Sequence, residues 1–229
     1  MDGFFNTNLV FEYFPKLLAR LHITLLIVVL ATVVGMILGI ILALCRIYKI
    51  YFLNQIATVY ISFVRGTPII VQMFIVYYGL PILLLKVGIN VMRWDKLFFV
   101  IITYGLSNAA YMSEIVRASI MGVPIGQSEA AYSVGMTKIQ TFFRILVPQA
   151  VLTAVPSVGT NIIALLHNSA IAFSLGIIDV MGAVQAIGSR THRTLEGYVG
   201  AGIIFLVLST LLEMGFSITE KKFKLIKSH

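Results

Sequence analysis

Long apolar runs, separated by short polar segments, dominate the chain. The clearest run, Leu21 to Cys45, contains no Asp, Glu, Lys or Arg. A hydrocarbon layer about 30 Å thick is crossed by about 20 helical residues, so this run predicts a transmembrane helix. We expect no cleaved signal peptide, because the chain begins with acidic and aromatic residues and the run is too long for a signal core.

The whole pattern predicts an all-α membrane protein in which residues 1–229 form a single transmembrane domain. The second and fourth apolar stretches exceed one span, and each holds residues that disturb a helix: Gly66 and Pro68, then Pro156 and Gly159. We therefore expect tilt, a break or an extension into water in both stretches. The five expected transmembrane helices cover residues of about 17–46, 53–85, 95–120, 147–176 and 197–220.

Composition excludes a soluble globular protein. The chain is 59% hydrophobic and 11% charged, with a mean hydropathy of +0.97, whereas soluble domains are roughly 25% charged. A net charge of +8 would suggest nucleic acid in a soluble protein. Here the basic residues lie in short loops and at the C-terminus, where they help set membrane orientation, so we expect no nucleic-acid partner. Cys45 is the only cysteine, which rules out an intrachain disulfide.

Charge also indicates which way the chain crosses the membrane. An odd number of spans puts the termini on opposite sides. Lys and Arg are slightly more frequent on the C-terminal side, and the tail "EKKFKLIK", Glu220 to Lys227, follows the last span directly. The sequence therefore predicts a cytoplasmic C-terminus and an extracytoplasmic N-terminus. The tail is also a candidate for contacts with membrane lipid headgroups.

Two groups of glycines suggest close approach between helices. Gly35 and Gly39 form a GxxxG pair in the first span, and Gly197, Gly200 and Gly202 lie in the last one. Such glycines let two helix backbones come together. The partner helix could belong to the same subunit or to a second copy, and the sequence leaves both open.

A polar, patterned segment interrupts the apolar chain between the third and fourth spans. It covers about residues 121–147 and includes most of "EAAYSVGMTKIQTFFRILVPQA", Glu129 to Ala150. Gly135 permits a bend between two short helices on the cytoplasmic side. Such helices either lie on lipid or dock in a groove of a soluble partner, and both uses fit its physical character. The segment offers few basic residues and several small or bulky apolar ones: Ala130, Ala131, Met136, Ile139 and Phe143.

The spacing within this segment resembles the EAA loop of ABC importer permeases. Glu129, Ala130 and Ala131 are followed by Gly135, then by Ile145 and Pro148, with Val147 where a leucine is usual. Two further stretches resemble the subfamily for polar amino-acid uptake, which includes histidine, glutamine and arginine permeases. They are "RGTPIIVQMFIVYYGLP", Arg65 to Pro81, and "YMSEIVRASIMGVPIGQSEAA", Tyr111 to Ala131. The similarity runs in register over about residues 15–220.

The resemblance implies the five-helix fold of a type I ABC importer permease in a prokaryotic cell (inner) membrane. Such a subunit works as a homodimer or with a related second permease. Its partners are a cytoplasmic dimer of ATP-binding cassette subunits and an extracytoplasmic substrate-binding protein. The expected function is import of an amino acid, polar or basic, by alternating access. The residues expected to couple it to the ATPase are Glu129, Ala130, Ala131 and Gly135.

The sequence gives no sign of an enzyme. It has no G-x-x-x-x-G-K-[ST] phosphate loop, so ATP and Mg²⁺ belong to the partner ATPase and we expect no cofactor in this chain. No His, Cys or carboxylate cluster has metal spacing. No nucleophile, base and orienting residue are recognisable together, so we propose no catalytic residue.

Polar residues within the spans are candidates for the substrate pathway, because they are costly in a membrane and transporter sites often lie near its midplane. Tyr104, Ser107, Asn108 and Tyr111 share one helix face by their spacing. The candidates are Gln72, Tyr104, Ser107, Asn108, Tyr111, Glu114, Asn161, His167, Asn168 and Ser169. Each could instead only pack against or hydrogen-bond a neighbouring helix.

Three of the polar positions carry additional expectations. We expect Glu114 to form an ion pair with a structural or gating role, for example with Arg117. We expect Arg65 to form a structural pair near the inner end of its span. His167 begins the run "HNSA", where many relatives carry a Lys-Asp-Thr-Ser-like run. This change either alters side-chain preference or is neutral.

Two other functions compete with the importer. A secondary transporter or channel without an ATPase would explain the spans and the polar residues, but not the cytoplasmic segment. A membrane enzyme is disfavoured, because no catalytic set is present.

Overall fold

The computed structural model describes the backbone of residues 5–227 and the side chains of residues 5–220. Within these residues every regular element is a helix. The α-helices are α1 (Thr7–Leu18), α2 (Leu21–Ile47), α3 (Tyr51–Gly66), α4 (Ile69–Lys86), α5 (Lys96–Met121), α6 (Ile125–Ser133), α7 (Lys138–Thr141), α8 (Val147–Ser169), α9 (Val180–Thr191) and α10 (Thr194–Lys227). A π-helix, η1 (Phe142–Leu146), joins α7 to α8, and a short 3-10 helix, η2 (Ala172–Leu175), follows α8.

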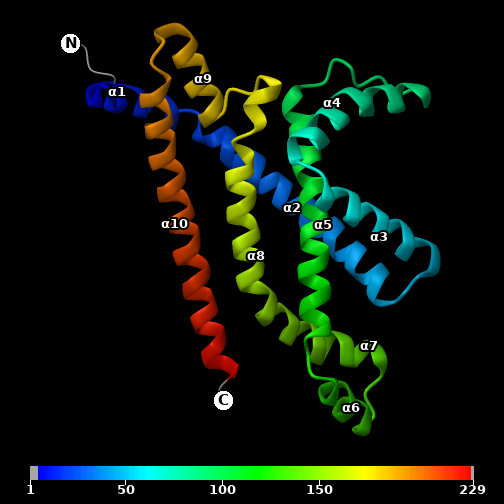
Figure 1. Cartoon of the computed structure of the whole chain (residues 1–229). Coiled ribbons are helices and arrows are strands. Elements are labelled where there is room, and N and C mark those ends of the chain that lie inside the picture. Colours follow the sequence, from blue (N-terminus) through cyan, green and yellow to red (C-terminus); the bar gives the residue numbers. More distant parts are fainter. Residues whose placement is uncertain (1–4, 228–229) are drawn as a thin grey trace.

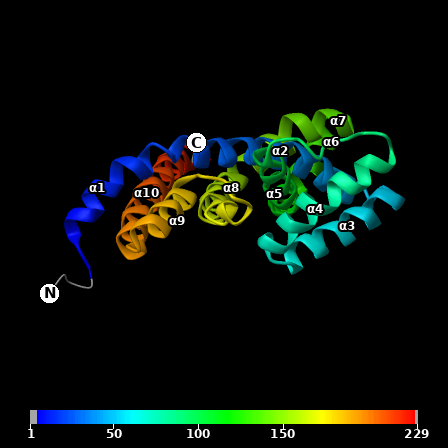
Figure 2. The ribbon, with the colours of Figure 1, turned by 90° about the horizontal axis from the view of Figure 1, so that it is seen from above.

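The structure confirms five candidate membrane spans. They are α2, α4, α5, the continuous helical stretch Lys138–Ser169 and the stretch Thr194–Glu220 of α10. Figure 2 shows α10, α8 and α5 in a row, with α2 lying along one side of the row. α10, the fifth span, lies at one end of this row, and α1 and α9 cover its N-terminal end (Figure 1).

In the second apolar stretch, about residues 53–85, the structure shows a break, one of the three outcomes expected there. The stretch forms two helices, α3 and α4, and only α4 is a candidate span. Thr67 and Pro68 between them have extended backbone, as the ring of a proline favours at the residue before it. Gln72 stabilises the break, since its side-chain amide donates to the carbonyl oxygens of Val64 at 2.8 Å and Thr67 at 3.0 Å.

Two helices were not predicted by the hydrophobic pattern. α1 carries charged residues among its apolar ones, and α9 is short and rich in Gly and Ala, so neither gives a membrane-length apolar run. Both are set by local signals. Asn6 caps α1 by accepting a hydrogen bond from the Asn8 N–H, and Asp179 caps α9 by accepting one from the Gly182 N–H.

The closest helix pair in the chain is α2 with α5. A Cβ atom placed on Gly35 would lie 2.5 Å from the side-chain nitrogen of Asn108, and one on Gly39 would lie 2.6 Å from the Cβ of Met112. α5 contributes a glycine to the same contact, since a Cβ atom placed on Gly105 of α5 would lie 2.7 Å from the side chain of Val34 on α2. The GxxxG pair therefore serves packing within the subunit.

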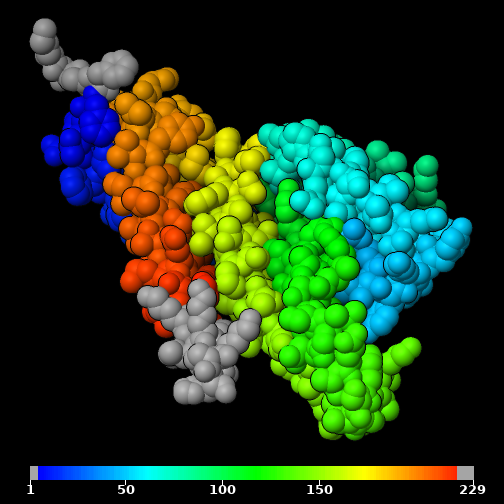
Figure 3. Space-filling model, turned by 60° about the horizontal axis from the view of Figure 1, so that its bottom comes forward, coloured from blue at the N-terminus to red at the C-terminus, as the bar shows by residue number. Residues whose placement is uncertain are grey.

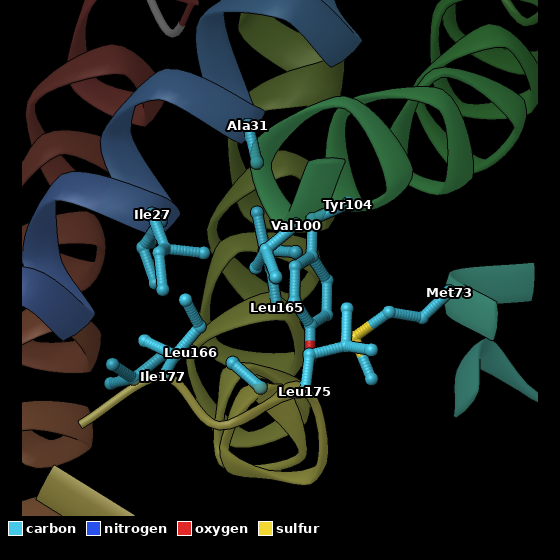
Figure 4. Packing of buried hydrophobic residues seen from close by; sticks show 11 residues of the cluster. Ile27, Ala31, Met73, Val100, Tyr104, Leu165, Leu166, Leu175 and Ile177 are labelled. Atoms are coloured by element: carbon cyan, nitrogen blue, oxygen red, sulfur yellow. The ribbon is translucent and has the colours of Figure 1, made fainter. Parts of the chain in front are cut away.

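The main apolar core lies where α2, α5 and α8 meet. Figure 4 shows Ile27 of α2, Val100 and Tyr104 of α5 and Leu165 of α8 pointing into this region. Tyr104 is fully buried and satisfies its hydroxyl by donating to the carbonyl oxygen of Asn168 at 2.7 Å. The core thus fixes α5 and α8 relative to each other.

The glycines of the last span also pack within the subunit. Gly197 lies against Val184 of α9, and Gly200 lies against Leu17 of α1, whereas Gly202 faces open space. These contacts dock α1 and α9 onto α10.

α1 and the C-terminal part of α10 lie at opposite ends of the molecule, and α6 and α7 lie at the same end as the C-terminal part of α10 (Figure 1). Figure 3 shows that α6 and α7 form a protrusion beyond the membrane-spanning helices. The side chains of the lysine-rich tail, Lys221, Lys222, Lys224 and Lys227, lie outside the described residues.

Enlarging a glycine between α2 and α5 should destabilise the fold. We expect Gly39→Val to lower the free energy of unfolding by about 1–3 kcal/mol, because its methyl groups collide with the α5 backbone. SDS-induced unfolding of the purified chain in mixed micelles measures the change. Gly202→Val is the matched control in α10, where nothing lies within 4 Å. Equal destabilisation by both substitutions would contradict the packing role of Gly39.

Candidate functional site

A polar cavity of about 450 Å³ lies between α5 and α8, with Ile69 of α4 at its edge. We call this space the polar cavity. It is lined by Ile69, Tyr104, Ser107, Asn108, Tyr111, Ile115, Ser157, Thr160, Asn161, Ala164, Leu165 and Asn168. Its hydrogen-bonding groups are hydroxyls and amides, and no Asp, Glu, Lys or Arg is among the described lining residues.

One wall of the polar cavity comes from α5. Tyr104, Ser107, Asn108 and Tyr111 all line it, as expected from their shared helix face. Asn108 is buried and accepts a hydrogen bond from the side-chain amide of Asn161. Its own amide donates to the carbonyl oxygen of Ala31 on α2, at 3.4 Å. Asn108 therefore connects the cavity wall to the α2–α5 contact.

The other wall comes from α8. Asn161 and Asn168 were expected here, but Ser157 and Thr160 were not. The sequence did contain a signal for them, because positions 157, 160, 161, 164 and 168 repeat at the three- and four-residue spacing of one helix face. Pro156 does not break this wall, since α8 is continuous through it.

The structure places three expected pathway residues outside the polar cavity. The amide of Gln72 is held by the backbone of the α3–α4 break. Ser169 is fully buried, and its hydroxyl donates to the carbonyl oxygen of Leu166 at 2.6 Å. His167 is exposed on α8 but is not among the lining residues.

Glu114 forms an ion triad rather than part of the cavity wall. It pairs with Arg117, whose Nη2 lies 2.8 Å from Oε2, as the sequence suggested, and also with Arg46 at the end of α2. Arg46 was not expected as a partner, because 68 residues separate it from Glu114 and only the α2–α5 packing brings them together. The triad joins the ends of α2 and α5 next to the protruding helices.

Arg65 lies beside the cavity rather than in an ion pair. Its guanidinium carbon is 5.8 Å from the centroid of the Tyr111 ring, a distance at which a cation is attracted to an aromatic face. The cation therefore contacts the cavity wall through Tyr111.

At the opposite end of the molecule, Asp179 is fully buried. Its carboxylate accepts hydrogen bonds from the Gly182 N–H at 2.8 Å and from the Thr24 hydroxyl at 3.5 Å. Burial disfavours the charged form and raises the pKa of Asp179 to about 6, although these hydrogen bonds act in the other direction. The residue ties the start of α9 to α2.

The protruding segment contains the bend predicted at Gly135. Gly135 has a φ of +79°, which an L side chain rarely adopts. After the bend, Thr137 and Gln140 form a reciprocal capping box that starts α7. The side chain of Gln149 on α8 donates to Gln127 of α6 at 3.1 Å. These contacts connect α6 and α7 to the cavity-lining helix α8.

The four residues expected to couple the chain to an ATPase are not equally accessible. Glu129, Ala130 and Gly135 are exposed, whereas Ala131 is buried within the segment. Large apolar side chains are exposed beside them, including Ile125, Val134 and Ile139. Exposed apolar groups of this size mark an interaction surface more often than a free one.

A five-span fold with a polar cavity between two of the spans, and with short helices protruding at one end, is typical of a membrane transport protein. Residues 35–225 match the family described as "binding-protein-dependent transport system inner membrane component". The chain belongs to this family, which confirms the resemblance seen in the EAA segment.

Relatives with known names show which kind of transport system the family members most similar to this chain belong to. The L-cystine transport system permease protein TcyL of Bacillus subtilis (strain 168) is 42% identical over 224 residues, covering 98% of this chain and 94% of that protein. The arginine transport system permease protein ArtQ of the same organism is 38% identical, covering 92% and 93%. A solved structure described as an amino acid ABC transporter with histidines has a TM-score of 0.86 and 30% identity, covering 96% of this chain and all of that one.

These comparisons show that the chain is the permease component of an amino-acid ABC transporter, a multi-pass protein of a bacterial membrane. It is the membrane subunit and not the ATPase, and its family implies ATPase and substrate-binding partners. The relatives support neither of the two competing functions, a transporter or channel without an ATPase and a membrane enzyme.

The stability of the fold should depend on pH through Asp179. Its pKa is higher in the folded chain than in the unfolded one, so the folded state holds the proton more tightly and stability falls as pH rises from about 4 to about 6. Unfolding of the purified chain across this range should show a loss of up to about 3 kcal/mol.

Asp179→Asn should remove that slope while keeping a good helix cap. Asp95→Asn is the matched control, because Asp95 caps α5 in the same way but is exposed. An unchanged slope in Asp179→Asn would show that another group is responsible.

Proposed function

We propose that this permease imports a polar amino acid with an uncharged side chain through the polar cavity, by alternating access. Movement would be driven by an ATP-binding cassette subunit docked on α6 and α7. The observation that carries this proposal is the cavity between α5 and α8, lined by neutral hydrogen-bonding groups and connected by Gln149 to the protruding helices.

The chemistry of the polar cavity supports the substrate class. A volume of about 450 Å³ falls within the range of small-molecule sites, roughly 300–1,000 Å³. Its amides and hydroxyls can donate to an α-carboxylate and accept from an ammonium group. A basic side chain, the other class left open by the sequence, would lack an acidic partner here, because Glu114 is held by two arginines. Cystine carries no net charge, and the relative named for L-cystine is more similar to this chain, at 42% identity, than the one named for arginine, at 38%.

The exposed surface of α6 and α7 supports the coupling role. Ile125, Val134 and Ile139 are each more than 70% exposed. A short helix with such side chains can dock in a groove of another protein. Glu129 and Ala130 lie exposed on the same segment, while Ala131 contributes by packing inside it.

The orientation and assembly follow from this docking. The end with α6, α7 and the C-terminus would face the cytoplasm, and the end with α1 and α9 would face the substrate-binding protein. Two permease subunits, identical or related, would sit on an ATPase dimer that holds the ATP and Mg²⁺. The open side of the polar cavity would then lie along the path between the subunits.

The substrate class is tested by binding. We expect the purified transporter to bind cystine or glutamine more tightly than arginine, lysine or histidine. We expect Asn161→Ala to weaken binding of the preferred amino acid about tenfold, since one hydrogen bond to a buried group is lost. Isothermal calorimetry in detergent measures both effects.

Ser209→Ala is the matched control, because Ser209 lies on α10 away from the cavity and bonds only its own helix. Preferential binding of the basic amino acids would contradict the neutral substrate. An unchanged affinity in Asn161→Ala would contradict the site.

The coupling role is tested by substitution at the bend. Gly135→Val should place a β-branched residue at positive φ, at a cost of about 1–2 kcal/mol or more, and misalign α7. Combined with Glu129→Arg, it should abolish co-purification with the ATPase subunit and substrate-stimulated ATP hydrolysis.

Gly88→Val is the matched control, because Gly88 has a φ of +84° in a turn at the other end of the molecule. It carries the same strain without touching the docking segment. Intact complex formation and transport in the double variant would refute the coupling role of this segment.

A further inference from the structure

A second cavity, of about 420 Å³, is lined almost wholly by apolar side chains from α2, α5, η1, α8 and α10. We call it the apolar groove. Ser119 contributes the only side-chain polar group among its lining residues. It shares no lining residue with the polar cavity, so the proposed substrate pathway does not use it.

The length and position of the apolar groove match one leaflet of a bilayer. Its α8 wall extends from Val147 to Val158, which at 1.5 Å per residue is about 16 Å. Half of a hydrocarbon core is about 15 Å thick. The groove begins at η1, beside the protruding helices, so it lies within the leaflet at that end of the molecule.

Aromatic side chains mark both ends of the apolar groove. At the deep end, Phe216 lies against Gly159, where an added Cβ would come within 2.6 Å of the ring. At the other end, Phe143 is 65% exposed at the rim and Phe142 contacts Tyr48. Phe216 therefore borders the groove near Gly159, and Phe142 and Phe143 border it at η1.

The shape of the apolar groove restricts what can fill it. Water does not occupy apolar space of this kind, because it would find no hydrogen-bonding partners. A helix of the same length, with a diameter of about 10 Å or more, would need roughly three times the volume. An acyl chain is narrow, apolar and present at this depth.

We propose that the apolar groove binds one acyl chain of a phospholipid, with the headgroup at the end near η1. The sequence beyond Phe216 supports an anionic headgroup, since it continues into "EKKFKLIK". The bound chain packs against Phe142 and Phe143 of η1. π-Helical turns are often found at functional sites. Here the turn connects the protruding helices α6 and α7 to α8, so the lipid packs at the connection between them.

Native mass spectrometry of the purified transporter tests this proposal. The complex is stripped with detergent and then titrated with phosphatidylglycerol. Wild type should retain one tightly bound lipid per permease subunit. Ala154→Phe fills the groove and should lower the affinity for the lipid about tenfold, the equivalent of losing roughly two buried methylene groups. Val151→Phe is a second filling variant, because Val151 also lines the groove and is half exposed.

Leu206→Phe is the matched control, since Leu206 is exposed on α10 and does not line the groove. It should bind lipid like wild type. Thermal unfolding of all variants checks that they are folded. Absence of a tightly bound lipid in wild type, or equal lipid retention in folded Ala154→Phe or Val151→Phe, would overturn the proposal.

Discussion

The contact between α2 and α5 is the constraint on which the other features of this permease depend. Glycines on both helices remove the side chains that would otherwise separate them, at Gly35 and Gly39 of α2 and at Gly105 of α5. In a membrane the hydrophobic effect does little to hold helices together, so close packing and interhelical hydrogen bonds must do so. The amide of Asn108 spans this contact to reach Ala31.

From this fixed pair, α5 presents different chemistry along its length. Near its middle it offers neutral amides and hydroxyls to the polar cavity, and nearer its end it holds Glu114 between two arginines. Keeping the carboxylate paired removes the cost of a free charge within the spanning region. It also leaves the cavity without an acidic group, which is why we propose a substrate with an uncharged side chain rather than a basic one.

Much of this could be predicted from the sequence. The length and polarity of the apolar runs were enough to predict five spans, because a helix that crosses a bilayer needs a long apolar run. A break near Pro68 was among the outcomes expected from the helix-disturbing residues there. The glycine of the docking segment was likewise readable, since the bend needs a positive φ at Gly135. By contrast, α1 and α9 were missed, because they have local caps and pack against α10 but form no membrane-length apolar run of their own.

The site was only partly predictable. The polar face of α5 followed from helical spacing, and the same rule would have found Ser157 and Thr160 on α8. Whether a polar side chain faces a cavity or its own backbone depends on tertiary contacts, which is why Gln72 and Ser169 looked like pathway residues. The pairing of Arg46 with Glu114 could not be found without knowing how α2 crosses α5.

The central claim is that α2 and α5 move as one body while the transporter works. Spin labels at Ile37→Cys on α2 and Met121→Cys on α5, both exposed positions, in a Cys45→Ala background, report this directly. Pulsed electron paramagnetic resonance would compare the transporter with and without ATP. The account predicts that the distance between the labels stays constant to within about 2 Å, the scale of small helix adjustments. A larger change between the two states would show that the glycine contact opens, and would contradict the account.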